Sequence, residues 1–167
     1  MQIFRFLFLS LACLVLTIGM MKLTRGDEGG EQDRAVKIAR YLESNPLAED
    51  SKELRKWALT WFIDHPELDF SVCTEFLAPL LKSQHPYSSE INLQMVLSSG
   101  AFVIENPEKM HDKPEVYLAG LGGSLRVYQA LLAADPKAKW RFLDGLVKIG
   151  EKGKLPGYIE AKSRSCR

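Results

Sequence analysis

The stretch PEVYLAGLGGSLRVYQALLAA, residues 114–134, determines the fold class. Apolar and small side chains recur in it at helical spacing along two faces. One face carries Val116, Ala119, Gly123, Val127 and Ala130, and the other carries Leu118, Leu121, Leu125, Tyr128 and Leu132. A helix that is apolar on two faces is surrounded by other elements. We therefore predict a central helix here, with the rest of the domain packed around it.

The flanking segments show the same 3.6-residue periodicity, broken by proline after residues 45, 65, 106 and 135. The predicted helices cover residues 31–44, 50–64, 70–83, 88–104, 114–134 and 135–152, with a short one over 156–162. No alternating run or hairpin turn indicates a strand. Residues 35–167 are thus expected to form a single all-α domain, a compact antiparallel bundle of about six helices. A tetratricopeptide-like stack of helical hairpins is the alternative.

Two groups of small residues fall inside these predicted helices: Ser98–Ala101, and Gly120–Ser124. Glycine-rich segments also cradle phosphate, but such a cradle needs a strand before it and a helix N-terminus after it. Because these glycines lie within a helical pattern, we expect them to allow close helix packing.

The N-terminus carries an uncharged run of sixteen residues, Phe6–Met21, between Arg5 and Lys22. A comfortable membrane span needs about 20 residues, whereas the core of a signal peptide is shorter. Residues 1–25 are therefore predicted to be a cleaved signal peptide, or alternatively a retained, tilted membrane anchor. The polar, glycine-rich residues 26–34 read as a linker to the domain.

Removal of such a leader leaves two cysteines, Cys73 and Cys166. In an oxidising compartment two cysteines can pair, and a cysteine one residue from the end has no packing reason to be there. We expect a Cys73–Cys166 disulfide tying the tail to the third helix. The alternative is a buried Cys73 and a free, exposed Cys166.

Charge is balanced overall, at +1, which argues against a protein that mainly binds nucleic acid. It is not evenly spread, because the chain from Lys137 onward holds nine Lys/Arg and three Asp/Glu. We expect a basic terminal helix to offer a protein-binding surface. Its candidate residues are Lys137, Lys139, Arg141, Lys148 and Lys152. The simpler interpretation is an ordinary solvated helix face.

Catalytic motifs are scarce in this sequence. In an up-and-down bundle, the loops holding His65 and His111 share one end, where carboxylates also lie, so these two histidines are the candidates for a metal site. Their spacing matches no metal-binding signature, and we expect no cofactor. Trp57 and Trp61, one helical turn apart, are expected in the core, with a ligand platform as the alternative.

A set of residues between Pro46 and Pro107 resembles a group of small exported bacterial proteins without an assigned function. The residues are Arg55-Lys56-Trp57, Trp61, Pro79-Leu80-Leu81, Tyr87-Ser88-Ser89-Glu90, Ala101-Phe102 and Ile104-Glu105. The similarity extends through Tyr128 to Leu143. It implies export and a helical fold, and it brings no activity, substrate or site residue with it.

These observations favour a non-enzymatic helical domain, periplasmic, secreted or tethered to a membrane, that binds another protein or acts in the cell envelope. The alternative hypothesis is an envelope-acting hydrolase or metal-dependent enzyme that uses the His65/His111 end.

Overall fold

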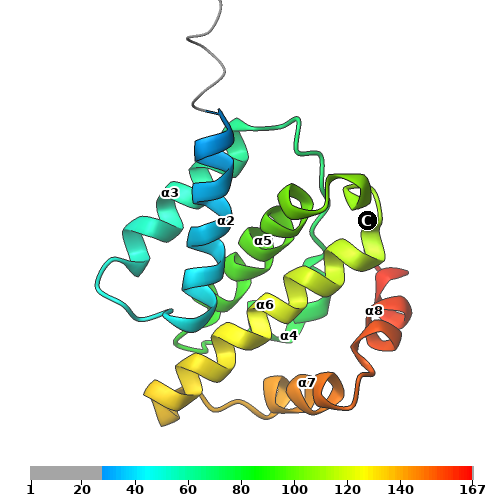
Figure 1. Ribbon diagram of the computed structural model, residues 1–167. Helices are drawn as coiled ribbons and strands as arrows, with labels where there is room; N and C mark the ends of the chain where they lie inside the picture. Colours follow the sequence, from blue (N-terminus) through cyan, green and yellow to red (C-terminus); the bar gives the residue numbers. More distant parts are fainter. Residues whose placement is uncertain (1–27, 167) are drawn as a thin grey trace, which may run out of the picture. The chain divides into compact units, whose positions relative to one another are not determined.

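A computed structural model describes residues 28–166, and every regular element in this range is a helix (Figure 1). The α-helices are α2 (Glu28–Ser44), α3 (Ser51–Asp64), α4 (Ala78–Leu81), α5 (Ser88–Glu105), α6 (Lys113–Ala134), α7 (Arg141–Glu151) and α8 (Leu155–Ser163). Short 3₁₀ turns, η1 (Thr74–Leu77), η2 (Pro107–Lys109) and η3 (Pro136–Ala138), lie between some of them. The all-α class predicted from the sequence is confirmed.

Helices α5 and α6 run antiparallel at the centre of the compact unit formed by residues 34–167 (Figure 1). Two serines join their backbones. Ser99 donates a hydrogen bond to the carbonyl oxygen of Val116 (3.2 Å), and Ser124 donates one to that of Ile91 (2.8 Å). Helices from both ends of the chain pack on this pair, which favours the compact bundle over a stack of equal hairpins.

Glycines let α5 and α6 approach each other this closely. A β-carbon at Gly120 would meet Ser99 and the backbone oxygen of Met95, and one at Gly123 would overlap the side chain of Ser98. The predicted role of these small residues in helix packing is confirmed. Both glycines lie inside α6 rather than ahead of a helix N-terminus, where a phosphate cradle would be.

Two apolar clusters lie on different faces of α5. One joins α2 and α3 to α5, and its buried members are Ala35, Ile38, Ala39, Leu42, Ala58, Trp61, Phe62, Leu97 and Ala101. The other gathers η1, α4, α6, α7 and α8 around the first half of α5, with Phe76, Leu80, Ile91, Tyr128 and Leu143 among its members. Because both clusters use α5, this helix links the two halves of the core.

Two predicted segments differ from the structure. Residues 28–34, expected to belong to a polar linker, form the beginning of α2, where acidic Glu31 and Asp33 suit the positive end of a helix dipole. The third helix predicted over 70–83 is reduced to η1 and the four-residue α4. Pro79 lies in the first turn of α4, because proline is tolerated there and not in a helix interior.

The predicted sixth helix also divides. Asp135 accepts a hydrogen bond from the backbone N–H of Lys137 (3.0 Å) and so caps η3, while Trp140 is extended and α7 begins at Arg141. Helix α7 ends at Glu151, and Gly153 follows it with a φ of +66°, the left-handed conformation expected just after a helix end.

Residues 1–25, the predicted signal peptide or anchor, lie outside the described residues. From residue 28 to residue 166, none of the helices has both the length and the apolar character needed to cross a membrane.

Candidate functional site

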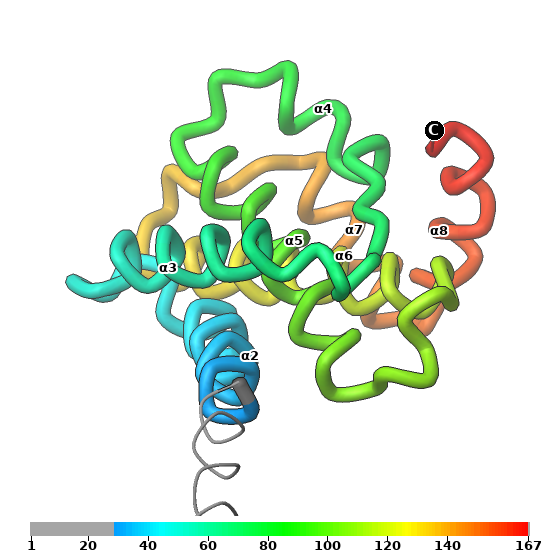
Figure 2. The backbone as a smooth tube through the Cα atoms, turned by 90° about the horizontal axis from the view of Figure 1, so that it is seen from above, coloured from blue at the N-terminus to red at the C-terminus, as the bar shows by residue number. Residues whose placement is uncertain are grey.

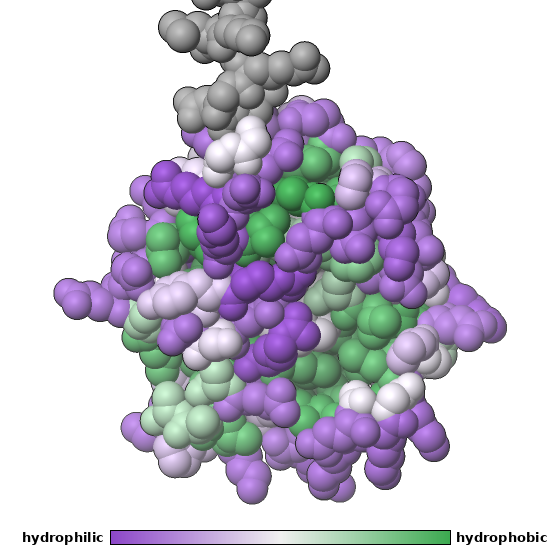
Figure 3. Space-filling model, viewed as in Figure 1, coloured by the Kyte–Doolittle hydropathy of each residue, from purple (hydrophilic) through white to green (hydrophobic). Residues whose placement is uncertain are grey.

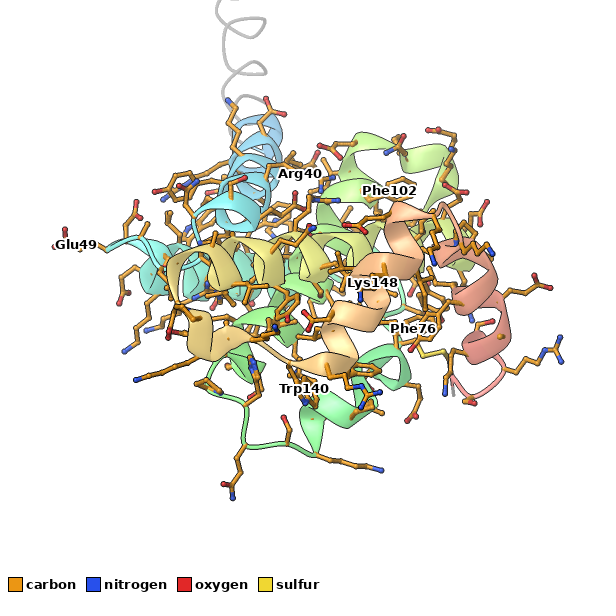
Figure 4. The ribbon with its side chains drawn as sticks, turned by 90° about the horizontal axis from the view of Figure 1, so that it is seen from below. Arg40, Glu49, Phe76, Phe102, Trp140 and Lys148 are labelled. Atoms are coloured by element: carbon orange, nitrogen blue, oxygen red, sulfur yellow. A yellow bond between two sulfur atoms is a disulfide. The ribbon has the colours of Figure 1, made fainter. Side chains whose placement is uncertain are left out.

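Cys73 and Cys166 lie at disulfide-bonding distance, with their Cα atoms 5.5 Å apart. Cys73 is extended just before η1, and α8 lies beside η1 (Figures 1 and 2). The same contact is supported by Tyr158 of α8, whose hydroxyl donates to the carbonyl oxygen of Phe76 (3.1 Å; Phe76 is labelled in Figure 4). The predicted pairing is therefore confirmed in geometry, and a disulfide of this kind fits an oxidising compartment.

The sequence predicted that the five basic candidate residues would share one terminal helix. In the structure they are spread over three segments. Lys137 lies in η3 and Lys139 follows it, Arg141 and Lys148 belong to α7, and Lys152 comes directly after that helix. All five are exposed. Within residues 28–166, the ion pairs join Arg40, Glu43, Glu105 and Arg126, and none of the five takes part in one. We call these five residues the basic surface.

Part of the basic surface surrounds a hollow of about 440 Å³, lined by Lys139 and Lys148 together with Asp144 and Glu151. Figure 4 shows Trp140 at the start of α7 and Lys148 farther along the same helix. The two acidic side chains reduce the positive charge at the hollow itself. The excess positive charge therefore lies outside this hollow, on Lys137, Arg141 and Lys152.

Tyr128 fixes the turn between η3 and α7, at Lys139 and Trp140, which we call the corner. Its hydroxyl donates to Asp144 (2.6 Å) and accepts from the backbone N–H of Trp140 (3.0 Å). Burial, with the hydrogen bond to Asp144, raises the pKa of Tyr128 to about 12. Tyr128 is thus a neutral anchor at ordinary pH rather than a base.

His85 supports the same corner through the backbone of η3, at Ala138. Its Nδ1 accepts from the backbone N–H of Tyr87 (3.2 Å), so Nε2 carries the proton that is donated to the carbonyl oxygen of Ala138 (2.8 Å). The ring also stacks on Trp140, with 5.6 Å between ring centroids. Sequence reasoning passed over this histidine, because only the fold brings it to η3.

The two histidines proposed as metal ligands have different surroundings. His65 places Nδ1 2.7 Å from the carbonyl oxygen of Trp61 and stacks on that indole at 4.0 Å, whereas His111 is exposed in the turn after η2. In the part of the chain that the structure describes, no three His, Cys, Asp or Glu side chains gather as metal ligands would.

The tryptophan pair lies at the edge of the first apolar cluster. Trp61 is buried, as expected of a core residue, and Trp57 is half-buried with its ring 6.4 Å from that of Trp61. The guanidinium carbon of Arg34 lies 4.1 Å from the centre of the Trp57 ring. Arg34 therefore covers a face of Trp57 that a ligand platform would have left open.

A buried carboxylate, Glu43, is a feature that sequence reasoning missed. It accepts two hydrogen bonds from Arg126 (2.8 Å each), one from Ser98 (2.7 Å) and one from Arg40 (2.8 Å). Burial alone would raise the pKa of Glu43, but these hydrogen bonds and positive charges outweigh it and lower the pKa. Glu43 is therefore held ionised and joins α2, α5 and α6. The signal in the sequence was Arg126, the one charge in the interior of an apolar helix.

A second hollow, of about 530 Å³, lies between the turn joining α2 to α3, helix α3 and the first turns of α5. Its wall includes Arg55, which is 8% exposed and whose Nε has no hydrogen-bond partner. The sequence marked Arg55 only as a neighbour of the tryptophans, and its burial comes from the α2–α3 turn folding over it.

A third, mainly apolar hollow of about 520 Å³ follows α6 where the chain turns from α7 into α8. Leu118, Ala119 and Leu155 line it, and Figure 3 shows apolar surface on this side of α6. No family model, curated protein or solved structure matches the chain.

Proposed function

We propose that this chain is an exported or membrane-tethered helical domain that binds an acidic partner protein through the basic surface and has no catalytic role of its own. The observation that carries the proposal is the exposure of five cations that form no ion pair within the described residues. Unpaired charges of one sign on a rigid corner steer an oppositely charged partner and set its orientation.

Two features support a location outside the cytosol. Residues 1–25 have the charge and hydropathy pattern of a signal peptide or anchor. The Cys73–Cys166 pair has disulfide geometry, and structural disulfides persist in the periplasm, at cell surfaces and in secreted proteins. A retained leader would tether the domain to a membrane, and a cleaved one would release the domain into the periplasm or the medium.

The rigidity of the corner favours binding over simple solvation. Tyr128, His85 and Asp135 fix the backbone on both sides of Lys137 and Lys139 by hydrogen bonds. A fixed backbone keeps the Cα atoms of these lysines at a constant spacing, which limits where their ammonium groups can meet complementary carboxylates on a partner.

Charge reversal tests this proposal. The variant K139E/K148E changes the basic surface, and K37E/K82E, at two exposed lysines elsewhere, is a control with the same change in net charge. A photo-crosslinker at position 129, an exposed glutamine beside Lys139 and Lys148 in the lining of the hollow, should capture the same acidic protein in cells with otherwise wild-type and control chains and lose it with K139E/K148E. Equal capture by all three chains would remove the basic surface from the account.

A further inference from the structure

A continuous groove runs along the face of α6 that lies toward α7 and α8. Three hollows, of about 440, 240 and 520 Å³, follow one another along this face, and neighbouring hollows share lining residues. Each hollow has one leucine of α6 in its lining, in the same order Leu132, Leu125 and Leu118. Because these leucines are spaced by seven residues, they lie nearly on one line along the helix. The groove therefore follows α6 over about 21 Å, at a rise of about 1.5 Å per residue.

Glycines keep this groove open. Gly122 of α6 and Gly150 of α7 line both the smallest and the largest of the three hollows. A β-carbon at Gly150 would meet nothing within 4 Å, and one at Gly122 would meet only Nη1 of Arg126, at 3.3 Å. The wall formed by α7 and α8 is apolar at Val147 and Leu155, and Figure 3 shows apolar surface on this side of α6. A segment that lies in the groove therefore buries apolar side chains.

Charge along the groove is balanced except at one end. The lining carries as many positive as negative side chains, Lys139, Lys148 and Arg126 against Asp144, Glu151 and Glu115. Where α6 leads into η3 and α7, the basic surface adds Lys137 and Arg141, which form no ion pair within residues 28–166. The segment that complements the groove is therefore apolar along α6 and acidic at this end.

The groove favours a helical occupant over an extended one. Its walls are side chains of helices, and residues 28–166 contain no strand whose edge could pair with an extended backbone. An extended segment would leave N–H and C=O groups without partners on the side that faces the leucines, which is costly. A helix satisfies these groups internally, and its apolar side chains at spacings of three and four match leucines spaced by seven.

We propose that this groove binds an amphipathic helix of the acidic partner protein. The apolar stripe of that helix packs along Leu118, Leu125 and Leu132, and its carboxylates meet Lys137 and Lys139 where α6 ends. This proposal rests on the partner interaction proposed above and names the form of the segment that the partner presents. It gives the interaction an apolar centre and a charged edge, as in other specific interfaces.

Three blocked peptides of about 15 residues test the form of the occupant. The first is an acidic amphipathic helix of leucine, alanine and glutamate, with leucines at alternating spacings of three and four. The second has the same composition in an order that spreads the leucines around the helix, and the third has lysine in place of glutamate. In fluorescence anisotropy titrations of the protein as isolated from cells, the first peptide should bind at least tenfold more tightly than either of the others. Absence of binding by the first peptide, or equal binding of either other peptide, would overturn the proposal.

Two glycine substitutions in α7 locate the binding. Gly150→Phe places a ring in the groove. Gly145→Phe is the matched control, because a β-carbon at either glycine meets nothing within 4 Å and Gly145 does not line the groove. Gly150→Phe should weaken the first peptide at least tenfold, with its helix content unchanged by circular dichroism, and Gly145→Phe should bind that peptide as wild type does. Binding that survives in Gly150→Phe would contradict the assignment.

The photo-crosslinker at position 129 separates this proposal from the partner interaction itself, because Gln129 lines the groove. We expect Gly150→Phe and K139E/K148E both to lose the acidic partner. Capture that is lost with K139E/K148E and kept with Gly150→Phe would remove the groove and leave the basic surface standing. Sedimentation of the protein alone should show a monomer. A dimer that dissociates in Gly150→Phe would show that a second copy of the chain occupies the groove and would overturn the proposal.

Discussion

Ser98 of α5 lies directly over Gly123 of α6, so close that a β-carbon at position 123 would overlap the serine side chain. The same serine donates a hydrogen bond to Glu43 and accepts one from Gln94. Ser98 cannot move away without breaking a buried network. The contact therefore fixes the distance between the two central helices.

Gly123→Ala should lower the free energy of unfolding by about 1–3 kcal/mol, the usual effect of overpacking a rigid core. Gly145→Ala is the matched control, because a β-carbon there meets nothing within 4 Å. In α7, that change should raise stability by about 0.5–1 kcal/mol through helix propensity. Urea unfolding of both variants measures the contrast, and a Gly123→Ala protein as stable as wild type would contradict the packing described here.

Glu43→Gln should cost about 2–3 kcal/mol at neutral pH, because it removes charged hydrogen bonds to two arginines. Glu105→Gln breaks only the more exposed contact with Arg40 and should cost less than about 1 kcal/mol.

A comparison of wild type with Glu43→Gln at different pH values tests whether Glu43 is ionised. The folded pKa of Glu43 lies below its ordinary value of 4.5, so its contribution is complete above that pH and is lost as the pH falls through the folded pKa. The stability difference between wild type and Glu43→Gln should stay constant above about pH 5.5 and shrink in acid. A difference that does not change with pH would show that Glu43 is not held ionised.

Removal of the disulfide by C73S/C166S should cost about 4–5 kcal/mol in the chain-entropy model, because the bond closes a long loop. The sequence separation of the two cysteines is 93 residues. Reduction of the wild-type protein should lower its stability by a similar amount and leave the double variant unchanged. Equal stability of oxidised and reduced wild type would show that the pair does not constrain the chain.

Tyr128→Phe tests the corner beneath the basic surface. The pKa of Tyr128 is raised to about 12, so its contribution is complete below its ordinary value of 10.0 and is lost as the pH rises toward 12. The stability difference between wild type and Tyr128→Phe should be constant up to pH 9 and decrease above pH 10. A difference that persists at pH 12 would mean that the hydroxyl is not buried as described.

Much of the helical fold followed from periodicity. The spacing of Val116, Leu121 and Leu125 placed α6 at the centre, and the glycines within it predicted close packing against another helix, which the structure shows to be α5. The prediction of one helix over residues 70–83 was wrong. The apolar pattern there reflects the burial of a 3₁₀ turn and one α-helical turn, which the spacing of apolar residues does not distinguish from a longer helix.

The candidate sites were harder to predict, since they depend on residues far apart in the chain. Glu43 and Arg126 are separated by 83 positions, and nothing local to either marks the pair. Nothing in the sequence marked Arg55 as buried, because the turn that buries it is placed by tertiary packing. The cysteines were easier, because the predicted removal of the leader would leave two of them, with a single possible intramolecular pairing.

The most direct test is to alkylate intact cells, fractionate them, and analyse the protein by mass spectrometry. We expect it outside the cytosol, with a Cys73–Cys166 linked peptide that appears as two free peptides only after reduction. Full-length chain in the soluble cytosol, with both thiols alkylated before reduction, would contradict an exported, disulfide-linked binding domain.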